Sequence, residues 1–437
     1  MAVVTRSQTV ELMASTRTLL GWGALLTYVL LWSWRASVSE SPRNTAFRAI
    51  LVTFWVLIFV IALEMCAALG VVNWGVLFRS ASRADDSYMT SFVTHPDGWF
   101  QRPSGAHWTT RPQSDLEMRW GLPASIREPI TFTFDAKGYR NVSDLERADI
   151  ALLGDSYVEG AYVSDDQTTA RLLEAEVARP VVNLGVAGFG PSYELRALMR
   201  DAAPLQPRVV VWFFFEGNDL YDPDLVPQDT ALVSLPPPPP RPAWRETVRF
   251  FTDRSVRRER GFTPNFLWQL STWTHPLFPN HIPDYGFLSL SGQEEQRVYF
   301  GDYGAVPWTS YEEQRWTEME GIFRSGSEFA RDRGMHLLLV YVPIKFRVYQ
   351  PLVTFPERSR LREWRVWPLP DRFRDFCLRS DLACLDLTET FRQSAREGYT
   401  PYAVTDTHWG PDGHRIAATA VVDELRDRDW LRIIEAR

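Results

Sequence analysis

The sequence has no basic tract and very little cysteine, and these two shortages exclude several classes of protein. Its 437 residues carry a formal net charge of −7, without the run of Lys and Arg that a nucleic-acid-binding protein uses against phosphates. Three cysteines are too few for a disulfide scaffold, and their spacing does not suggest zinc. Cys377 and Cys384 could bond to each other in an oxidising compartment, or they could be two separate buried thiols. With 45% apolar and 23% charged residues, the chain has the composition of a globular protein.

Two long apolar runs lie near the N-terminus. Residues 18–34 contain no charge, and residues 49–78 contain a single one, Glu64. Both reach the length of a membrane span, so the sequence predicts an anchor over residues 1–78 with transmembrane helices at about 18–34 and 49–72. A cleaved signal peptide is the alternative for the first run, although its flank offers a poor cleavage site. Three Arg in the connection 35–48 favour a cytoplasmic loop, which would place the large C-terminal region outside the membrane.

The carboxyl group of Glu64 would be costly in the second span, where it is placed near the middle. It would serve a contact with another membrane protein, or it would be a protonated or locally bonded residue that faces the first span. The sequence leaves both interpretations open.

From residue 149 onward, short apolar runs alternate with helical segments. Strands are predicted at 149–153, 181–184, 208–215, 336–342 and 383–387. This alternation predicts an open parallel sheet of about five strands with helices on both faces. Residues 79–133 are interpreted as a linker and cap, and the aromatic- and proline-rich residues at about 221–307 as an insertion, with a polyproline segment at 236–240.

Chemically distinctive residues follow the predicted strands. "GDSYVEG" follows the first, "GVAGFGPS" the second and "EGND" the third, while "DTHWGPDGH" comes after the fifth strand and a short helix. Ligands of open parallel sheets bind beyond the carboxyl ends of the strands, so these four blocks are expected to meet at one edge. A serine hydroxyl needs a base within hydrogen-bond reach, and a histidine oriented by a carboxylate provides one.

The order of these blocks resembles that of the SGNH (GDSL) hydrolase superfamily. The match runs from about Phe134, where "FDAKGYRN" begins, to Asp427 and is interrupted by the insertion, which implies an SGNH hydrolase-like domain over residues 134–437. The resemblance implies a flavodoxin-like three-layer α/β fold. It also implies that Ser156 is the nucleophile, His408 the base and Asp406 its orienting carboxylate. Gly188 and Asn218 would join the Ser156 backbone in the oxyanion hole. No metal or other cofactor is expected.

Two further residues next to this set are candidates for substrate contacts. Asp155 precedes the serine, and Trp409 follows the base, where its ring could stack on a sugar or simply pack. Lys345, in a "YVPIKFRVYQP" stretch, is given no catalytic role.

The Asp406-x-His408 spacing departs from the Asp-x-x-His of most SGNH hydrolases. It is similar to a bacterial branch that includes O-acetyltransferases of exported polysaccharides, but there the pair precedes the serine, whereas here it follows.

These features together predict a membrane-anchored enzyme outside the bacterial cytoplasmic membrane that forms an acyl-enzyme from an acyl ester. Water would make it an esterase, and a sugar hydroxyl of a cell-envelope glycan would make it an O-acyltransferase. The resemblance adds a membrane-bound O-acyltransferase as a candidate partner. The alternative is a non-catalytic SGNH-like module of the cell envelope.

Overall fold

The computed structural model describes residues 42–74, 77, 92–94, 100–112, 114–120, 128–221, 243–252, 257, 261–274, 284–290, 294–301 and 307–435. They pack as two units, described separately below: one within 1–90 and 238–280, the other within 91–237 and 281–437. The predicted first span, 18–34, and the polyproline segment, 236–240, lie outside the described residues.

The larger unit is built on a five-stranded parallel sheet. Its strands are β5 (Ile150–Leu153), β6 (Val181–Asn183), β7 (Val209–Phe215), β10 (His336–Val342) and β12 (Ala383–Asp386). Their order is β12-β10-β7-β5-β6, and every neighbouring pair is parallel. The five predicted strands are therefore confirmed.

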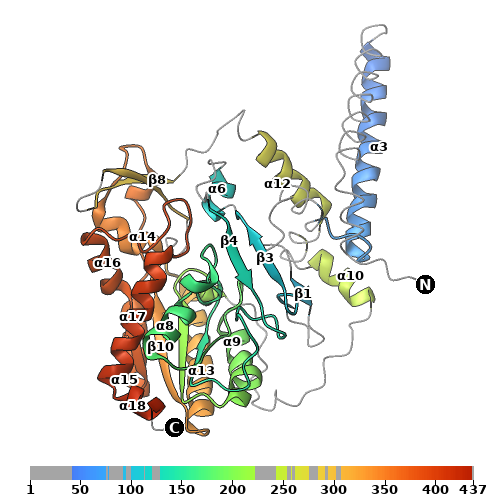
Figure 1. Ribbon diagram of the computed structural model, residues 1–437. Helices are drawn as coiled ribbons and strands as arrows, with labels where there is room; N and C mark the ends of the chain where they lie inside the picture. The colour runs from blue at the N-terminus through green and yellow to red at the C-terminus, as the bar shows by residue number, and fades with distance from the viewer. Residues whose placement is uncertain are drawn as a thin grey trace. The chain divides into compact units, whose positions relative to one another are not determined.

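Helices cover both faces of this sheet, which explains why its strands are continuous apolar runs. Alternate residues of β7 point to opposite sides, so that Val211 and Phe213 join one core, and Trp212 and Phe214 the other. The first core is closed by α8 (Thr169–Val177), α14 (Lys345–Tyr349), α16 (Thr388–Arg396) and α17 (Pro411–Asp427). The second is closed by α9 (Pro191–Ala197), α13 (Ser310–Arg331) and α15 (Leu369–Ser380). The result is the predicted three-layer α/β arrangement (Figure 1).

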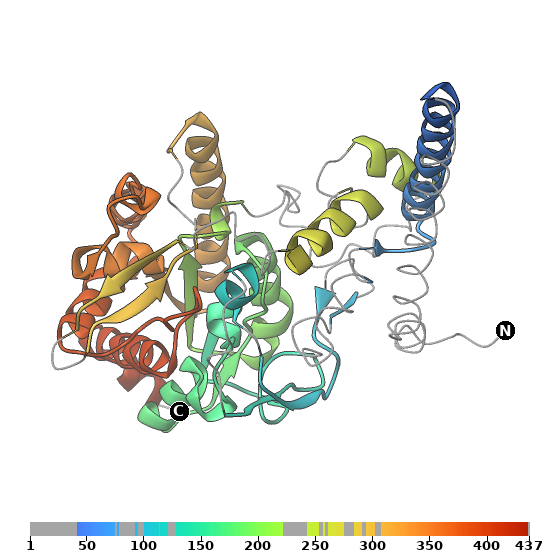
Figure 2. The same ribbon diagram turned by 90° about the horizontal axis from the view of Figure 1, so that it is seen from above.

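Several small elements lie at the rim of the larger unit. They are the short pair β1 (Val93–Thr94) and β2 (Phe100–Gln101), the hairpin of β3 (His107–Thr110) and β4 (Ile130–Thr133), and α6 (Asp115–Trp120). A three-stranded antiparallel sheet, β11-β8-β9, joins Val353–Thr354 to the hairpin Tyr285–Leu288 and Gln296–Tyr299 of the insertion. The view from above in Figure 2 separates this small sheet from the central one.

Cys377 of α15 and Cys384 of β12 form a disulfide. Of the two alternatives that the sequence left open, the structure has the bonded pair, which ties a covering helix to an edge strand of the sheet.

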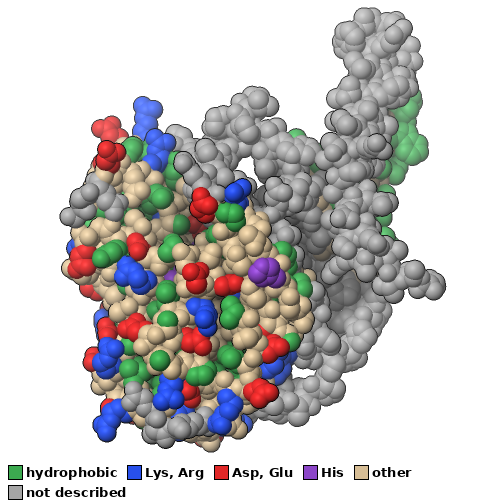
Figure 3. Space-filling model, in the orientation of Figure 1, with side chains coloured by type: hydrophobic (Ala, Val, Ile, Leu, Met, Phe, Trp, Pro, Cys, Tyr) green, Lys and Arg blue, Asp and Glu red, His purple; other side chains and the backbone are tan. Residues whose placement is uncertain are grey.

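The smaller unit contains one helix that is long and apolar enough to cross a membrane. It is α3 (Pro42–Ala68), whose Ile50–Ala68 stretch has a mean hydropathy of 2.6 and is largely exposed. Figure 3 shows hydrophobic side chains along the visible edge of this helix. Within the described residues this is the single candidate span, so the second predicted span has a counterpart and the prediction of two is not confirmed.

Glu64 lies four residues before the end of α3, not near the middle of a span as predicted. The helix stops at Ala68, earlier than the apolar run suggested. The carboxylate accepts the backbone N–H groups of Phe262 (3.1 Å) and Thr263 (2.7 Å), at the start of α12 (Phe262–Thr274). Glu64 is thus bonded locally, and its partner among the described residues is a helix of the insertion.

Candidate active site

Ser156 is the first residue of α7 (Ser156–Glu159), directly beyond the carboxyl end of β5. The turn between them needs Gly154, because its φ is +157° and an added Cβ would lie 2.4 Å from the Val158 side chain. Asp155 caps α7 by accepting the Tyr157 N–H at 2.9 Å. The cap leaves the Ser156 hydroxyl available for other partners.

His408 and Asp406 reach Ser156 from the loop that precedes α17. His408 Nε2 lies 2.9 Å from Ser156 Oγ, and His408 Nδ1 lies 2.6 Å from Asp406 Oδ1. A proton on Nδ1 donates to the carboxylate and leaves Nε2 free to accept the serine proton, which is the arrangement that a general base requires. The structure therefore brings together the three residues predicted as the catalytic set, although 252 positions separate the serine from the histidine.

Burial by itself would lower the pKa of His408, but the Asp406 carboxylate outweighs it and raises the pKa of His408 to about 9. Asp406 is almost completely buried, and its pKa is lowered because the neighbouring His408 and several N–H donors offset its desolvation. The carboxylate thus remains ionised beside the imidazole over the neutral range.

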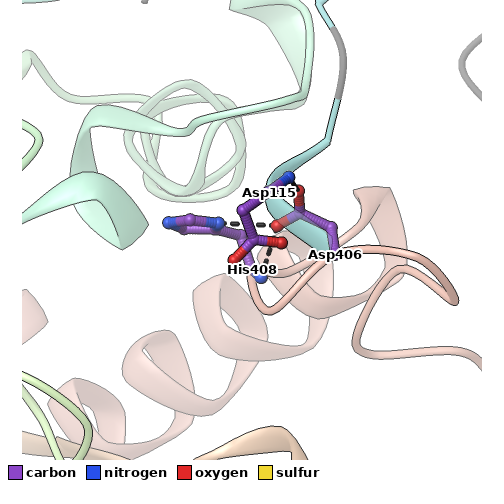
Figure 4. A group of neighbouring side chains, drawn as sticks. All are labelled: Asp115, Asp406 and His408. Carbon is purple, nitrogen blue, oxygen red and sulfur yellow. Dashed lines mark hydrogen bonds and ion pairs between the residues drawn. The ribbon is translucent and has the colours of Figure 1, made fainter. Parts of the chain in front are cut away.

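A second carboxylate, that of Asp115, lies next to this pair (Figure 4). No motif or spacing in the sequence indicates it. The backbone N–H of Asp115 donates to Asp406 Oδ2 at 2.8 Å. In return, the Asp115 carboxylate accepts the Thr407 N–H at 3.0 Å and the Thr407 hydroxyl. Both oxygens of Asp406 are thereby held, one by His408 and the other by the segment that carries Asp115.

The contacts of Ser114 and Glu117 extend this link. Ser114 Oγ donates to the carbonyl of Thr405 at 2.6 Å, and the Thr405 hydroxyl donates to Glu117 Oε1 at 2.9 Å. Residues 114–117 therefore clasp residues 405–407. Part of the predicted linker and cap is in this way a structural part of the candidate site.

Donor atoms of Asp115, Asp406 and His408 lie within 4.8 Å of one another, close enough to suggest a metal site. Their hydrogen bonds give a different explanation. Asp406 already accepts from His408 and from the Asp115 backbone, and Asp115 accepts from Thr407. We assign no metal to this cluster.

Replacing Asp115 with Asn is expected to move the acid limb of the pH–rate profile to lower pH, by about one unit. Burial and the Asp406 charge raise the pKa of Asp115 to about 7, so above that pH its carboxylate is ionised and helps to hold His408 protonated. The base must be neutral to act, so activity rises as pH passes upward through the pKa of His408. Removing the Asp115 charge lowers that pKa.

Glu117→Gln is the matched control. Glu117 belongs to the same segment, 114–117, but its carboxylate accepts from the Thr405 hydroxyl and does not contact Asp406 or His408. The measurement is kcat/KM for a chromogenic ester against pH. Equal shifts in the two variants would show that the effect comes from a loosened loop and not from the Asp115 charge.

The predicted oxyanion-hole residues both follow strands that flank Ser156. Gly188 lies beyond β6 with a φ of +83°, a conformation that favours glycine, and Asn218 lies beyond β7. The loop of Gly188 is held by Glu159, which accepts the N–H of Ala187 at 2.8 Å and forms a fully buried ion pair with Arg102 at 2.7 Å. A loop fixed in this way suits a preorganised donor site, and the role of both residues remains a prediction.

The segment "FDAKGYRN" contacts the backbone that follows Ser156 and the end of the neighbouring strand β6. Arg140 donates to the carbonyls of Glu159 (3.2 Å) and Val163 (2.6 Å), which follow Ser156. The side chain of Asn141 pairs with the backbone of Asn183 at the end of β6, at 2.9 and 3.0 Å. Through these contacts the motif holds the backbone on both sides of the candidate nucleophile in this chain.

Trp409 does not face the site. Its side chain is 1% exposed and packs against Tyr157, Phe213 and Phe391 in the core. Packing, the second of the two alternatives, is therefore the role that the structure supports, and we withdraw the sugar-stacking prediction.

Asp155 is also buried, and besides capping α7 it lies 3.4 Å from the Ser156 hydroxyl. Burial raises the pKa of Asp155 to about 6. Both contacts are internal to the protein, so they give the predicted substrate contact no support, and that role stays a prediction.

Lys345 supports the loop that carries Asp406. Its ammonium group donates to the carbonyls of Ala403 (2.5 Å), Val404 (2.8 Å) and Asp406 (2.8 Å). Burial lowers the pKa of Lys345 to about 7. These three contacts give the residue a structural use that agrees with the absence of a catalytic assignment.

A family model described as "SGNH hydrolase-like domain, acetyltransferase AlgX" matches residues 308–437, which include Asp406 and His408. No curated protein matches the chain. Solved structures that are similar include an acetylxylan esterase from Geobacillus stearothermophilus (12% identity, 64% of this chain and 95% of that one, TM-score 0.33). A lipase/acylhydrolase from Enterococcus faecalis (14%, 64% and 95%, TM-score 0.32) and a GDSL-like lipase from Bacteroides thetaiotaomicron (11%, 65% and 89%, TM-score 0.31) are further examples.

TM-scores this low carry no argument about function, and the fold is established by the sheet order described above. The family model covers the last third of the chain, where the base and its carboxylate lie. Over residues 308–437, the resemblance to the SGNH hydrolase superfamily, close to its acetyltransferase branch, is thereby confirmed.

Proposed function

We propose that the protein is a membrane-anchored enzyme that transfers acyl groups from esters through a covalent intermediate on Ser156. The observation that carries the proposal is the continuous hydrogen-bond chain from Ser156 Oγ through His408 to Asp406, with contacts of 2.9 and 2.6 Å. Each contact has the length and the order that nucleophilic catalysis needs.

In the proposed reaction His408 Nε2 accepts the serine proton while Ser156 Oγ attacks the acyl carbonyl carbon. The protonated imidazole then gives that proton to the departing alcohol, which leaves an acyl-enzyme. A second hydroxyl, deprotonated by His408, attacks the acyl-enzyme and restores the serine. Gly188, Asn218 and the Ser156 N–H would stabilise both oxyanions, and losing one such donor typically costs about 10²–10³ in rate.

The proposed acceptor is a sugar hydroxyl of a cell-envelope glycan, and water is the competing acceptor. The matched model supports transfer of an acyl group over its hydrolysis, because it is named after an acetyltransferase. The apolar helix α3 supports a membrane anchor. The disulfide between Cys377 and Cys384 supports a catalytic domain outside the cytoplasm, since such bonds persist in oxidising compartments.

Two measurements test the proposal. Detergent-solubilised full-length protein is treated with a fluorophosphonate probe, which should label it once, at Ser156. Failure of well-folded protein to react would favour a non-catalytic module. Mass spectrometry of envelope glycans from cells with wild-type or Ser156→Ala protein then separates transfer from hydrolysis: transfer predicts acyl groups that are missing in the variant, and de-esterification predicts acyl groups that accumulate.

A further inference from the structure

Two helices of the insertion pack against the C-terminal end of α3 in the smaller unit. The first is α10 (Ala243–Thr252), whose Thr247 hydroxyl donates to the carbonyl of Ala68 at 3.2 Å. Phe250 of α10 is buried with Ala67 and Ala68, and Trp74 packs against them. The end of the apolar helix is therefore covered by residues that lie about 180 positions later in the chain.

The second helix, α12, is joined to α3 by Glu64, whose carboxylate accepts its first two N–H groups. Gly261 makes this approach possible, because an added Cβ would lie 2.5 Å from the Arg257 carbonyl and 3.1 Å from Glu64 Oε2. The ring of Phe262 meets Trp74 edge to face at 5.2 Å, and the Trp74 indole N–H donates to the carbonyl of Leu63 at 2.9 Å. The junction is thus specific and uses both polar and aromatic contacts.

Neither insertion helix can be an ordinary core helix or a full membrane span. α12 has 13 residues and no charged one, so it extends about 20 Å, short of the roughly 30 Å of bilayer hydrocarbon. Its Leu267 is 56% exposed, and Val248 and Phe251 of α10 are about half exposed. An apolar stretch of this length is either a buried core helix or a segment in the membrane interface, and the exposed large apolar side chains favour the interface.

The position of the junction on α3 agrees with this. The Ile50–Ala68 stretch has 19 residues, about 28 Å of helix, which matches the hydrocarbon thickness. With this stretch across the bilayer, Ala68 would lie at one boundary of that layer, Glu64 about one helical turn inside it, and Trp74 beside them, since its indole donates to the Leu63 carbonyl. Tryptophan is enriched at such boundaries, and a carboxylate that accepts two N–H groups there is less costly than one at the bilayer centre.

We infer that α10 and α12 form a membrane-surface collar around the end of α3. The collar lies in the lipid interface on the side of the C-terminal end of the span, with Glu64 joining α12 to the span. This inference rests on the proposed membrane anchoring and is independent of the proposed chemistry. Its partner is the lipid surface itself.

Three leucines serve as matched labelling positions in the full-length protein, after Cys66 has been replaced with Ser. Leu57→Cys lies near the middle of the apolar stretch of α3, Leu267→Cys on α12, and Leu378→Cys on α15 of the larger unit; all three leucines are exposed. Each variant is labelled with bimane and placed in nanodiscs of phosphatidylcholine and phosphatidylglycerol. Lipids carrying a nitroxide near the headgroup or near the chain end then quench the label according to its depth.

The label at position 267 should lose most of its emission to headgroup-proximal nitroxide, the label at 57 to chain-end nitroxide, and the label at 378 should keep its emission with both. Quenching at 57 together with a response at 267 no larger than at 378 would overturn the collar and leave the anchor intact. A label at 57 that neither nitroxide quenches would overturn the anchor and the collar together. Neither outcome affects the fluorophosphonate test of the active site.

The joining role of Glu64 has its own test. In a Glu64→Ala protein the N–H groups of Phe262 and Thr263 lose their acceptor, so headgroup-proximal quenching at position 267 should fall while quenching at 57 is unchanged. Equal quenching at 267 with and without Glu64 would show that α12 reaches the interface without this contact and would overturn the joining role.

Discussion

Ser156→Ala is expected to lower the kcat for ester turnover by a factor on the order of 10⁶ and to abolish fluorophosphonate labelling. The Ser156 hydroxyl is the group that His408 Nε2 contacts, and without it neither the attack nor the acyl-enzyme can form. The fold should be unaffected, because the cap of α7 is supplied by Asp155 and not by the serine. Turnover of p-nitrophenyl acetate and the intact mass of the treated protein are the measurements.

Ser325→Ala is the matched control. Ser325 lies on α13, and its hydroxyl donates to the carbonyl of Gly321 in the same helix at 3.0 Å. This variant should label and turn over like the wild type. Labelling that persists in Ser156→Ala would place the nucleophile elsewhere and would contradict the proposed mechanism.

The sheet could be predicted from the sequence because its physical cause is local. A strand buried on both faces must be largely apolar, and the first three strands of this sheet are each followed by a block that contains glycine and polar residues. Val209–Phe215 illustrates this, since all seven of its residues are buried. The same reasoning located Ser156 and Asn218 at strand ends, and the family pattern connected them with Asp406 and His408.

Residues whose role depends on distant partners could not be found in this way. Asp115 lies in a segment with no clear periodicity, and its contacts are to residues about 290 positions away. Glu159 lies three residues after Ser156, but its partner Arg102 lies 57 positions before it in the chain. No local pattern encodes either pair, so only the folded chain reveals them.

The two errors of interpretation have a related cause. The exposure of Trp409 is decided by tertiary packing. The local sequence around a tryptophan next to a catalytic base is the same whether its ring faces a sugar or the core. Glu64 was placed near the middle of a span because the apolar run continues to residue 78, whereas the helix ends at Ala68. Composition gives the length of an apolar run and not the point where its helix stops.

Asp406→Asn is the second large effect, an expected loss of about 10⁴ in kcat with the fold retained. Asp406 Oδ1 accepts from His408 Nδ1 and from the His408 backbone, while Oδ2 accepts from the Asp115 backbone. An asparagine has one acceptor oxygen for these donors. If that oxygen faces the Asp115 N–H, the amide N–H₂ faces the imidazole and favours the tautomer protonated on Nε2, which cannot accept the serine proton.

The pH profile separates this explanation from simple disorder of the loop. Without the Asp406 charge the pKa of His408 falls from about 9, so the small remaining activity should extend to lower pH than in the wild type. Asp412→Asn is the control, because Asp412 lies in the same region and accepts the Thr400 N–H at 3.0 Å without contacting His408. A loss in kcat for Asp406→Asn no greater than for Asp412→Asn would mean that Asp406 does not orient His408. An acid limb that does not move would mean that the Asp406 charge does not raise the pKa of His408. Both results together would leave Asp406 without a role in the proposed mechanism, and the functional part of the hydrogen-bond chain would be Ser156 and His408 alone.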